Sequence, residues 1–371
     1  MILAKKVRLK PTKEQIIQLW KSVGTARWVY NWALAKQEEN YKIGGKFISD
    51  RILRKELTIL KKTDEFAWLY EASNNITKQA IKDLCDAYNR FFEGLTHKPQ
   101  FKSSRKSKAS FYNDNVKLKV KGNKVLIEKV GWTVTSETIP NEKYFNPRIS
   151  FDGKYWYLSV GIDTSRPTVE LTDISLGVDV GINKLAICSD GEKKKNINKT
   201  ISVKKAEKRL RRLQRQVSRK YNKNKEGNRF VKTGNIIKIE NKIRHLHRRL
   251  SNIRRNHLHQ SSNDIVKTKP YRIVMENLNI EGMMKNKHLA KAIAKQCLYE
   301  FKRQVQYKCE KYGIEFVEAN KWYPSSKMCS SCGNIKNDLK LSDRLYSCKC
   351  GHKMDRDLNA AINLSRYELA I

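Results

Sequence analysis

Residues 175–191 read SLGVDVGINKLAICSDG, and they place a carboxylate where an apolar side chain is expected. Apolar residues alternate with glycines around Asp179, and a second apolar run, LAIC, follows a tight GIN turn. This pattern predicts a β-hairpin with Asp179 in its first strand. A buried, unpaired carboxylate is costly, so Asp179 needs a partner or a metal ion. A surface strand is the alternative, and the apolar flanks count against it.

Two further acidic positions stand at the ends of predicted elements. In YRIVMENLNI (271–280) a short apolar run ends on Glu276, a position that carries little information alone. In DRDLNAAINLSRYEL (355–369) Asp355 and Asp357 stand at the start of the closing helix. Acids at a helix start are favoured by the helix dipole, which is a purely structural explanation. The functional interpretation is that one of the two turns inward beside the other carboxylates.

Three carboxylates on a strand, a strand end and a helix start suit a phosphodiesterase with two divalent cations. Two ions about 4 Å apart would activate water and stabilise the leaving oxygen. Mg²⁺ prefers such hard oxygen ligands, and Mn²⁺ is the alternative. Because the three positions are far apart along the chain, their spacing alone does not prove this hypothesis.

The cysteines near the C-terminus form two close pairs, Cys329-x-x-Cys332 and Cys348-x-Cys350, each followed by glycine. Two such turns are typical of a zinc ribbon, in which four thiolates hold one tetrahedral Zn²⁺. His352 is an alternative ligand to one of the cysteines. The enclosed segment is too polar to fold unaided, so we expect the ion to stabilise it. The isolated thiols are expected in the core: Cys85, Cys188, Cys297 and Cys309.

The charge of the chain indicates a polyanionic partner. Its 371 residues include 77 Lys and Arg against 37 Asp and Glu, a formal net charge of +40. Such an excess favours nucleic acid, with an anionic membrane as a distant second. Residues 191–260 hold 24 of the basic and 4 of the acidic residues, and two apolar stripes there predict a basic helical hairpin.

The chain shows no apolar run of signal-peptide or membrane-spanning length, so we expect a cytoplasmic protein without a membrane partner and with reduced thiols. The N-terminal third reads as a strand followed by helices to about residue 95. Alternating segments between residues 116 and 162 predict a small antiparallel sheet or barrel. The first strand could close onto this sheet, which would make the helices an insertion.

Two stretches of this N-terminal part carry side chains suited to nucleic acid. In SNNITKQ (73–79), Asn74 and Lys78 share a helical face with Asn75 beside them, and such side chains read base edges. A solvated helix face is the simpler alternative. Residues 98–115 mix basic and aromatic residues, as in a backbone-contacting and stacking segment or a flexible linker.

Taken in order, these motifs resemble the TnpB family of transposon-encoded, RNA-guided nucleases, which are regarded as ancestral to type V CRISPR effectors. The resemblance covers essentially the whole chain, and its C-terminal motifs are highly specific. It rests on TARWVYN (25–31), FKSSRKSKASF (101–111), GVDVGINKLAICSDG (177–191), YRIVMENLNIEGMMKN (271–286), WYPSSKMCSSCG (322–333) and CKCGHKMDRDLNAAINL (348–364).

The resemblance implies a multidomain α+β protein. A β-barrel wedge domain would comprise residues 1–10 and 111–172, with a helical recognition domain inserted at 11–110. An RNase H-like (RuvC) α/β nuclease domain would follow at 173–371. Within that domain we expect the basic helical hairpin at 203–260 and the zinc-ribbon insertion at 325–352.

The resemblance also implies the function. Asp179, Glu276 and Asp357 would form the metal-binding catalytic triad, with Asp357 preferred over Asp355 because it directly precedes LNAA. A guide RNA from the transposon end would direct the protein to double-stranded DNA beside a short transposon-adjacent motif. The basic hairpin would grip guide RNA or heteroduplex through its backbone.

By position in the family, Asn74, Asn75 and Lys78 are candidates for reading the adjacent motif, with Tyr112 and Asn113 as helpers. Two other functions are weighed against guided cleavage: a guided DNA-binding repressor, which would lack part of the acidic triad, and an RNase H-like transposase or recombinase. We expect a monomer. The guide RNA, the adjacent motif and the cleavage pattern cannot be read from the sequence.

Overall fold

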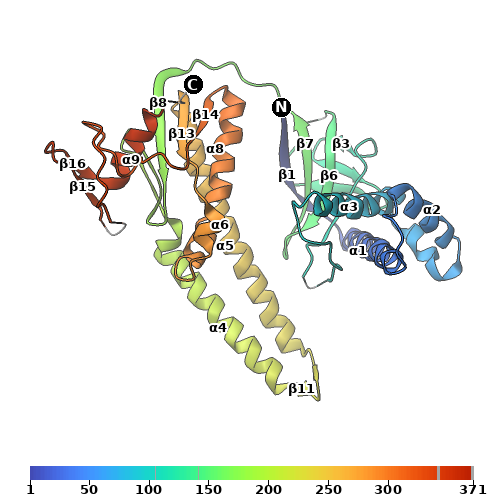
Figure 1. Cartoon of the computed structure of the whole chain (residues 1–371). Helices are drawn as coiled ribbons and strands as arrows, with labels where there is room; N and C mark the ends of the chain where they lie inside the picture. The colour runs from blue at the N-terminus through green and yellow to red at the C-terminus, as the bar shows by residue number, and fades with distance from the viewer. Residues whose placement is uncertain (105, 141, 341–342, 369–371) are drawn as a thin grey trace. The chain divides into compact units, whose positions relative to one another are not determined.

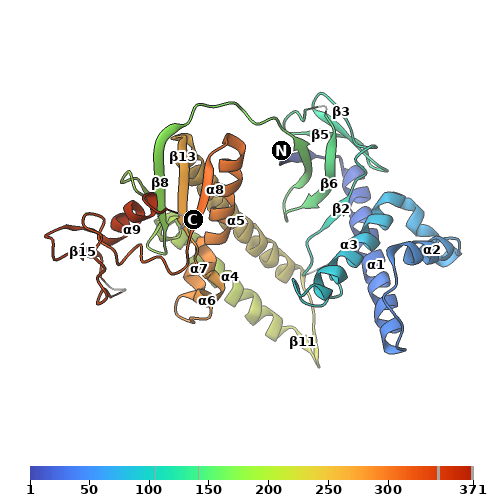
Figure 2. The ribbon, with the colours of Figure 1, turned by 45° about the horizontal axis from the view of Figure 1, so that its top comes forward.

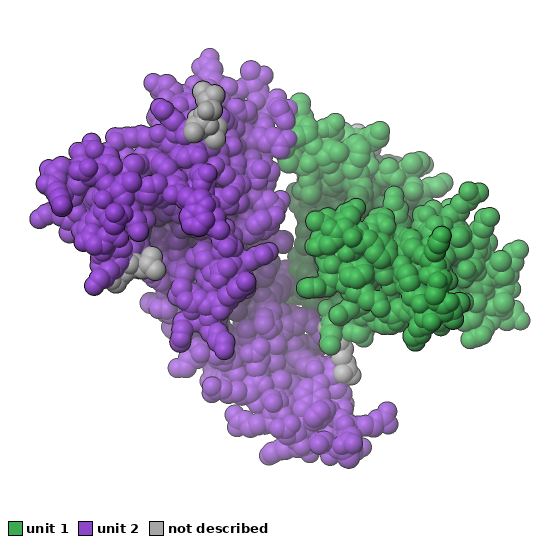
Figure 3. Space-filling model, in the orientation of Figure 1, with its two compact units in different colours: residues 1–165 green, residues 166–371 purple. Residues whose placement is uncertain are grey.

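The computed structural model describes residues 1–104, 106–140, 142–340 and 343–368, and it divides into two compact units, residues 1–165 and 166–371 (Figure 3). Positions 105, 141, 341–342 and 369–371 of the expected domains lie outside the described residues. The expected boundary after residue 172 is too late, because residues 166–172 belong to the second unit. Arg166 pairs with Glu310, and Thr172 bonds the Lys269 carbonyl within that unit.

Unit 1 contains a seven-stranded antiparallel sheet in the order β2-β6-β7-β1-β5-β4-β3. The first strand does join it, since β1 pairs with β5 and β7. A closed barrel would need β2 to pair with β3, and the described strands show no such pairing. The strands are β1 (Ile2–Lys10), β2 (Ser110–Tyr112), β3 (Lys119–Lys121), β4 (Lys124–Ile127), β5 (Gly131–Thr135), β6 (Tyr144–Phe151) and β7 (Trp156–Asp163).

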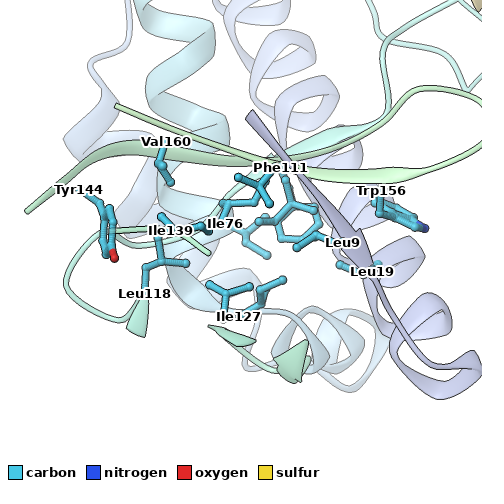
Figure 4. Packing of buried hydrophobic residues seen from close by; sticks show 14 of the residues in the cluster. Leu9, Leu19, Ile76, Phe111, Leu118, Ile127, Ile139, Tyr144, Trp156 and Val160 are labelled. Carbon is cyan, nitrogen blue, oxygen red and sulfur yellow. The ribbon is translucent and has the colours of Figure 1, made fainter. Parts of the chain in front are cut away.

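The helices between β1 and β2 are an insertion into this sheet. They are α1 (Lys13–Lys42), α2 (Asp50–Leu60), the 3₁₀ helix η1 (Asp64–Glu71) and α3 (Asn74–Phe92). Thr12 and Gln15 cap α1 reciprocally, and the Ser73 hydroxyl caps α3, which explains where both helices begin. Leu19 and Ile76 extend the sheet core into α1 and α3 (Figure 4).

Unit 2 is built on a five-stranded mixed sheet in the order β10-β9-β8-β13-β14, in which β8, β13 and β14 run parallel. The expected hairpin around Asp179 is confirmed, because β8 and β9 pair in antiparallel fashion. The strands are β8 (Thr172–Val180), β9 (Lys184–Cys188), β10 (Lys193–Lys195), β13 (Pro270–Glu276) and β14 (Glu315–Ala319).

Helices cover the two faces of the parallel strands. Helix α8 (Leu298–Tyr312) and the C-terminal part of α5 (Gly234–Lys267) pack on the face that carries Val178 and Met275. Helix α9 (Arg356–Ser365) packs against β8 on the opposite face (Figures 1 and 2). The arrangement is that of an α/β domain whose parallel strands are buried on both sides.

The basic hairpin consists of α4 (Ile201–Lys223) and α5, whose tips are joined by β11 (Lys225–Glu226) and β12 (Arg229–Phe230). The predicted apolar seam is confirmed, because side chains of α4 and α5 such as Leu210 and Leu246 form one cluster. However, α5 continues past the expected end at residue 260. Leu258, Ile265 and Val266 belong to the core of the sheet domain, so one helix serves both hairpin and domain.

The remaining elements are short. They are the 3₁₀ helix η2 (Ile197–Lys199), α6 (Ile280–Met284), α7 (Ala290–Gln296), and the two-stranded ribbon of β15 (Leu345–Ser347) and β16 (Lys353–Asp355). The ribbon therefore extends three residues past the expected end at residue 352, because β16 pairs with β15 up to Asp355. Among the described helices, none combines the length and the apolarity needed to cross a bilayer.

Candidate metal centres

Strand register brings Asp179 and Glu276 together. Val178 of β8 pairs with Met275 of β13, so Asp179 and Glu276 follow at adjacent positions of neighbouring parallel strands. Side chains alternate between the faces of a strand, and Val178 and Met275 face α8 and α5. Asp179 and Glu276 therefore share the opposite face, the one that α9 covers.

Helix α9 delivers the third carboxylate to this face. Gly177 of β8 lies so close to α9 that an added Cβ would stand 1.9 Å from the Ala361 carbonyl oxygen. Leu364 of α9 packs with Val274 of β13 in the same small core. Asp357 lies in the first turn of this helix, one turn before Ala361, and so approaches the ends of both strands.

The electrostatics show that the three carboxylates influence one another. Loss of hydration, and next the negative charges of Glu276 and Asp357, raise the pKa of Asp179 well above its ordinary value. Burial also raises the pKa of Glu276, and the charge of Asp357 adds to this effect. All three side chains are half-buried. Arg356 supplies a neighbouring positive charge, because its guanidinium lies 3.4 Å from Asp357.

Asp355 caps helix α9, whereas Asp357 lies in its first turn. Its Oδ1 accepts hydrogen bonds from the backbone N–H groups of Asp357 (3.0 Å) and Leu358 (3.3 Å), which makes it the N-cap of α9. Its Oδ2 pairs with Lys184 Nζ at 3.4 Å. Burial alone would raise the pKa of Asp355, but these donors outweigh burial and lower it. Of the two acids, Asp357 is the one whose carboxylate the cap leaves available.

Glu276 is held by a residue from the segment that leads into the ribbon. The buried Ser325 hydroxyl donates to Glu276 Oε1, and the Ser325 carbonyl accepts from Asn363 Nδ2 at 2.7 Å. Asn363 and Asn359 of α9 also donate to the Met328 carbonyl at 2.6 and 2.7 Å. The start of the ribbon, Glu276 and α9 are thus one hydrogen-bonded assembly.

A buried glutamine fixes the turn that follows Asp179. Gln296 of α7 donates through Nε2 to the carbonyls of Gly181 (3.0 Å) and Lys184 (3.4 Å), and it is 3% exposed. Its Oε1 accepts from Asn198, which also accepts from Arg254 of α5 at 2.8 Å. A continuous chain of hydrogen bonds therefore joins the base of the basic hairpin to the Asp179 hairpin.

The predicted cysteines form a second centre. The sulfur atoms of Cys329, Cys332, Cys348 and Cys350 all lie within 4.8 Å of one another. The pairs Cys329–Cys350 and Cys332–Cys348 are 3.8 and 3.5 Å apart. A Zn–S bond of about 2.3 Å places tetrahedral sulfurs roughly 3.8 Å apart. Four thiolates at this spacing suit one zinc ion.

His352 is not needed as a zinc ligand. Its Nε2 lies 3.3 Å from the Ser330 hydroxyl, and four sulfurs already complete a tetrahedral set. Three of the isolated cysteines are buried as expected: Cys85, Cys188 and Cys309. Cys297 is the exception, because it is half-exposed at the junction of α7 and α8 with a left-handed backbone (φ 55°).

The carboxylates and the thiolates offer different ligand chemistry. Hard oxygen donors suit Mg²⁺ or Mn²⁺, whereas the compact sulfur set suits zinc.

In unit 1, the candidate motif-reading residues fall into two groups. Lys78 is exposed on α3, one turn from Asn74, which is also exposed. Asn74 Oδ1 accepts from Lys61 Nζ at 3.0 Å, and Asn75 Nδ2 donates to the Glu128 carboxylate at 3.2 Å. The side chains of Asn74 and Asn75 are thus partly engaged, while Lys78 remains accessible.

Tyr112 and Asn113 have unlike surroundings. Tyr112 is half-buried beside Arg148 and lines a cleft of about 720 Å³ between α3 and the sheet. Asn113 is 1% exposed, and its Oδ1 accepts from the Glu128 backbone N–H at 3.0 Å. Asn113 therefore has a structural position, whereas Tyr112 borders an open cleft.

Several residues that complete the site could not be recognised from the sequence around them. Ser325 and Gln296 act on partners far along the chain, and the requirement for Gly177 arises only when α9 packs on β8. Asp355 is different, because an aspartate two residues before Asp357 at a helix start fits an N-cap. From the sequence alone, this pattern could have assigned the N-cap to Asp355 and left Asp357 for the site.

Three family models match successive parts of the chain. A helix-turn-helix domain model matches residues 1–46, a model described as "Probable transposase" matches residues 157–287, and a Cas12f1-like TNB domain model matches residues 299–364. The last of these includes the cysteine cluster and most of α9.

Curated relatives are similar over nearly the full chain. A protein of Streptomyces pristinaespiralis named "Putative RNA-guided DNA endonuclease" is 31% identical over 98% of this chain and 89% of its own length. "Putative RNA-guided DNA endonuclease InsQ" of Escherichia coli K12 is 30% identical over 97% of this chain and 90% of its own. Shorter matches of 32% identity include TnpB-like proteins of a mimivirus, over 36% of this chain and 26% of theirs.

Among solved structures, the chain is similar to a Cas12f1 chain in a complex with sgRNA and target DNA. That match has a TM-score of 0.40 and 18% identity and covers all of both chains. A second, a CRISPR-Cas12f ternary complex, has a TM-score of 0.41 and 16% identity over 95% of this chain and 82% of that one.

Proposed function

The chain belongs to the TnpB family, and from this membership we propose that it is an RNA-guided DNA endonuclease encoded by an insertion-sequence transposon. Its target would be double-stranded DNA beside a short transposon-adjacent motif. The observation that carries the proposal is the convergence of Asp179, Glu276 and Asp357 on the α9 face of the sheet.

The three carboxylates would hold two Mg²⁺ or Mn²⁺ ions. Desolvation and neighbouring carboxylates disfavour the negative charges of Asp179 and Glu276, and divalent cations would offset that cost. Bound there, the ions would activate water and stabilise the leaving 3′ oxygen of a phosphodiester.

The remaining side chains of the site would position these ligands. Ser325 would orient Glu276 through its hydroxyl, and Asp355 would begin α9 so that Asp357 turns toward the strands. Gln296 and Lys184 would hold the turn after Asp179. None of these groups needs to contact the substrate, because each acts through the backbone or a carboxylate.

The zinc ribbon would be a structural insertion of the RuvC-like domain. Its entry segment carries Ser325, and its second strand, β16, runs directly into the cap of α9. One zinc ion held by the four cysteines would therefore stabilise the two connections on which Glu276 and Asp357 depend.

The basic hairpin would bind the guide RNA or the RNA–DNA heteroduplex. Exposed cations line α4, among them Arg211, Arg212 and Arg215, while the apolar seam between the helices is buried. Contacts of this kind recognise phosphates without reading sequence, which suits a guide whose sequence varies.

For the adjacent motif, the proposal relies on Lys78 and Asn74, which are exposed on α3, and on Tyr112, which borders the cleft. Asn75 would support them from the same helix. Asn113 would support this region from inside the sheet. The cleft next to Tyr112 also contains Arg148, which pairs with Asp83 through two contacts of 2.7 Å.

Two other functions remain as alternatives. A guided repressor without cleavage would be expected to lack part of the triad, and all three acids are present here. A transposase or recombinase with the same nuclease core would need a DNA-joining activity, for which the sequence offers no recognisable module.

The first experiment is to express the gene with its natural flanking DNA and sequence any RNA that co-purifies. A single species with a structured part and a variable 3′ end supports guided function and supplies the target to test.

Cleavage of that target should disappear in Asp179→Ala, while guided binding persists. The matched control is Asp173→Ala, an exposed acid on the same strand, which should cut normally. Cutting by Asp179→Ala would refute the proposed triad.

A further inference from the structure

The segment between β14 and the ribbon displays an unusual side chain. Trp322 is 82% exposed, more than any other tryptophan among the described residues. Tryptophan is highly buried on average, although single exposed apolar residues are common on protein surfaces. Exposure alone therefore assigns no role to Trp322. Its position in the fold and the hydrogen bonds that hold its backbone are more informative.

Trp322 lies close to the carboxylate face. Ala319 at the end of β14 pairs with Glu276, and Ser325 donates a hydrogen bond to the same glutamate. Trp322 is three residues from each. Because an extended chain spans at most about 3.6 Å per residue, the Trp322 Cα lies within roughly 11 Å of both anchors.

The backbone that carries Trp322 is firmly held. The Trp322 N–H donates to Asn320 Oδ1 at 2.9 Å, and the Asn320 N–H donates to the Tyr367 hydroxyl at 3.1 Å. Tyr323 turns inward, where its ring meets Tyr367 edge-on at 4.9 Å and its hydroxyl donates to the Asn363 carbonyl at 3.0 Å. The indole is thus presented outward from an anchored turn.

The charge next to the indole suits nucleic acid. Lys321 is exposed, and its ammonium lies 5.2 Å from the centre of the Trp322 ring. An aromatic face with an adjacent cation matches a base with its phosphate, the combination by which proteins bind single strands. We propose that the DNA strand entering the carboxylate site stacks one of its bases on Trp322, which positions the scissile phosphate.

This inference rests on the proposed function and deepens it by assigning a positioning residue to the cleaved strand. Trp322 would act on a base near the scissile phosphate, without contacting the reacting atoms. Stacking on an aromatic ring does not read sequence, so the role is compatible with a target set by the guide.

The test uses the full chain with its guide RNA and measures single-turnover cleavage of the matched target. Trp322→Ala should slow cleavage about ten- to a hundredfold. Trp322→Phe should restore most of the rate, while guided target binding and thermal stability stay unchanged. The control is Tyr299→Ala, which removes another exposed aromatic side chain (65%) of the same unit, on α8, and should cut at the normal rate.

Abasic nucleotides placed one at a time along the cleaved strand sharpen the test. At one position near the cut, the abasic site should slow the unaltered protein and leave Trp322→Ala no slower than before, since the stacking partner is already missing. Equal rates for all variants, or loss of binding or stability in Trp322→Ala, would overturn the inference while guided cleavage stands. If the unaltered protein with its guide does not cut at all, both the proposed function and this inference fail.

Discussion

Lys184 Nζ and Asp355 Oδ2 lie 3.4 Å apart, and this ion pair joins the turn after Asp179 to the N-cap of the helix that carries Asp357. Asp355 thus contributes in two ways, as a cap through Oδ1 and as an ion-pair partner through Oδ2. The two acids of the DRD triplet can therefore be separated by experiment.

Asp355→Asn should retain the cap, because asparagine caps helices as well as aspartate, and should lose only a partly exposed ion pair. We expect cleavage within a few-fold of normal. Asp355→Ala should lower the free energy of unfolding by about 0.5–2 kcal/mol. Asp357→Asn should abolish cleavage at unchanged stability. Denaturant unfolding and cleavage rates measure both effects, and an inactive Asp355→Asn with an active Asp357→Asn would reverse the assignment.

Gly177→Ala should destabilise unit 2 by about 3 kcal/mol, because the new methyl group meets the backbone of α9, which cannot move without displacing Asp357. Gly234→Ala is the matched control. Gly234 begins α5, nothing lies within 4 Å of its added Cβ, and alanine is the better helix former. Urea unfolding of the two variants should show a large loss for the first and none for the second.

Gln296→Leu removes the donors that hold the Gly181 and Lys184 carbonyls while keeping a similar volume. Buried carbonyls left without donors should lower the free energy of unfolding by about 1–3 kcal/mol. We also expect slower cleavage with unchanged guide RNA binding, because the turn after Asp179 loses its support. Gln306→Leu, at an exposed position of α8, serves as the control for the substitution itself.

Removal of zinc should abolish cleavage even in excess Mg²⁺. Cys332→Ser leaves three thiolates, so the ribbon should unfold and release both Ser325 and the cap of α9. Metal analysis should find about one zinc per chain in the unaltered protein. Cys297→Ser changes a thiol outside the cluster and should retain both zinc and activity. Full activity in the zinc-free protein would show that the ribbon does not support the site.

Asp179→Asn should stabilise the metal-free protein at neutral pH while abolishing cleavage. The raised pKa of Asp179 means that the folded state binds more protons than the unfolded state, so stability falls as the pH rises above the ordinary carboxyl pKa of about 3.9. The neutral amide of Asp179→Asn does not lose stability in this way. The variant should therefore be more stable than the unaltered protein at pH 7.5 in a chelator, and this difference should vanish toward pH 4. Thermal unfolding with and without Mg²⁺ checks this, since the cation should stabilise only the unaltered site.

Local features made much of the site predictable. The zinc ligands are close in sequence, and the alternation around Asp179 is a property of one strand, so both could be read from short segments. The amphipathic seam of the hairpin was equally local and is confirmed. Each of these patterns can be recognised within a single strand, a single helix or a pair of turns.

Other features depend on contacts that no short segment reveals. The sequence predicted α5 as a helix of the hairpin only. The apolar stripe of α5 does not change at the point where the helix enters the sheet domain, so nothing in the sequence marks that point. The boundary near residue 172 was misplaced for a similar reason, since Thr172 is held by Lys269 across ninety-seven positions. In the sequence, Ser325 and Gln296 do not differ from other polar residues, because their hydrogen-bond partners are far along the chain.

The order in which the chain is synthesised would separate in time the proposed binding of RNA from the proposed cleavage of DNA. Helix α5, which completes the basic hairpin, ends at Lys267, and Asp357 is added 90 positions later. At roughly 5–20 residues per second, the ribosome needs about 5 to 18 seconds to cover that interval. A nascent chain would therefore expose the proposed RNA-binding surface before the proposed nuclease site is complete, so a guide could be engaged before any DNA could be cut.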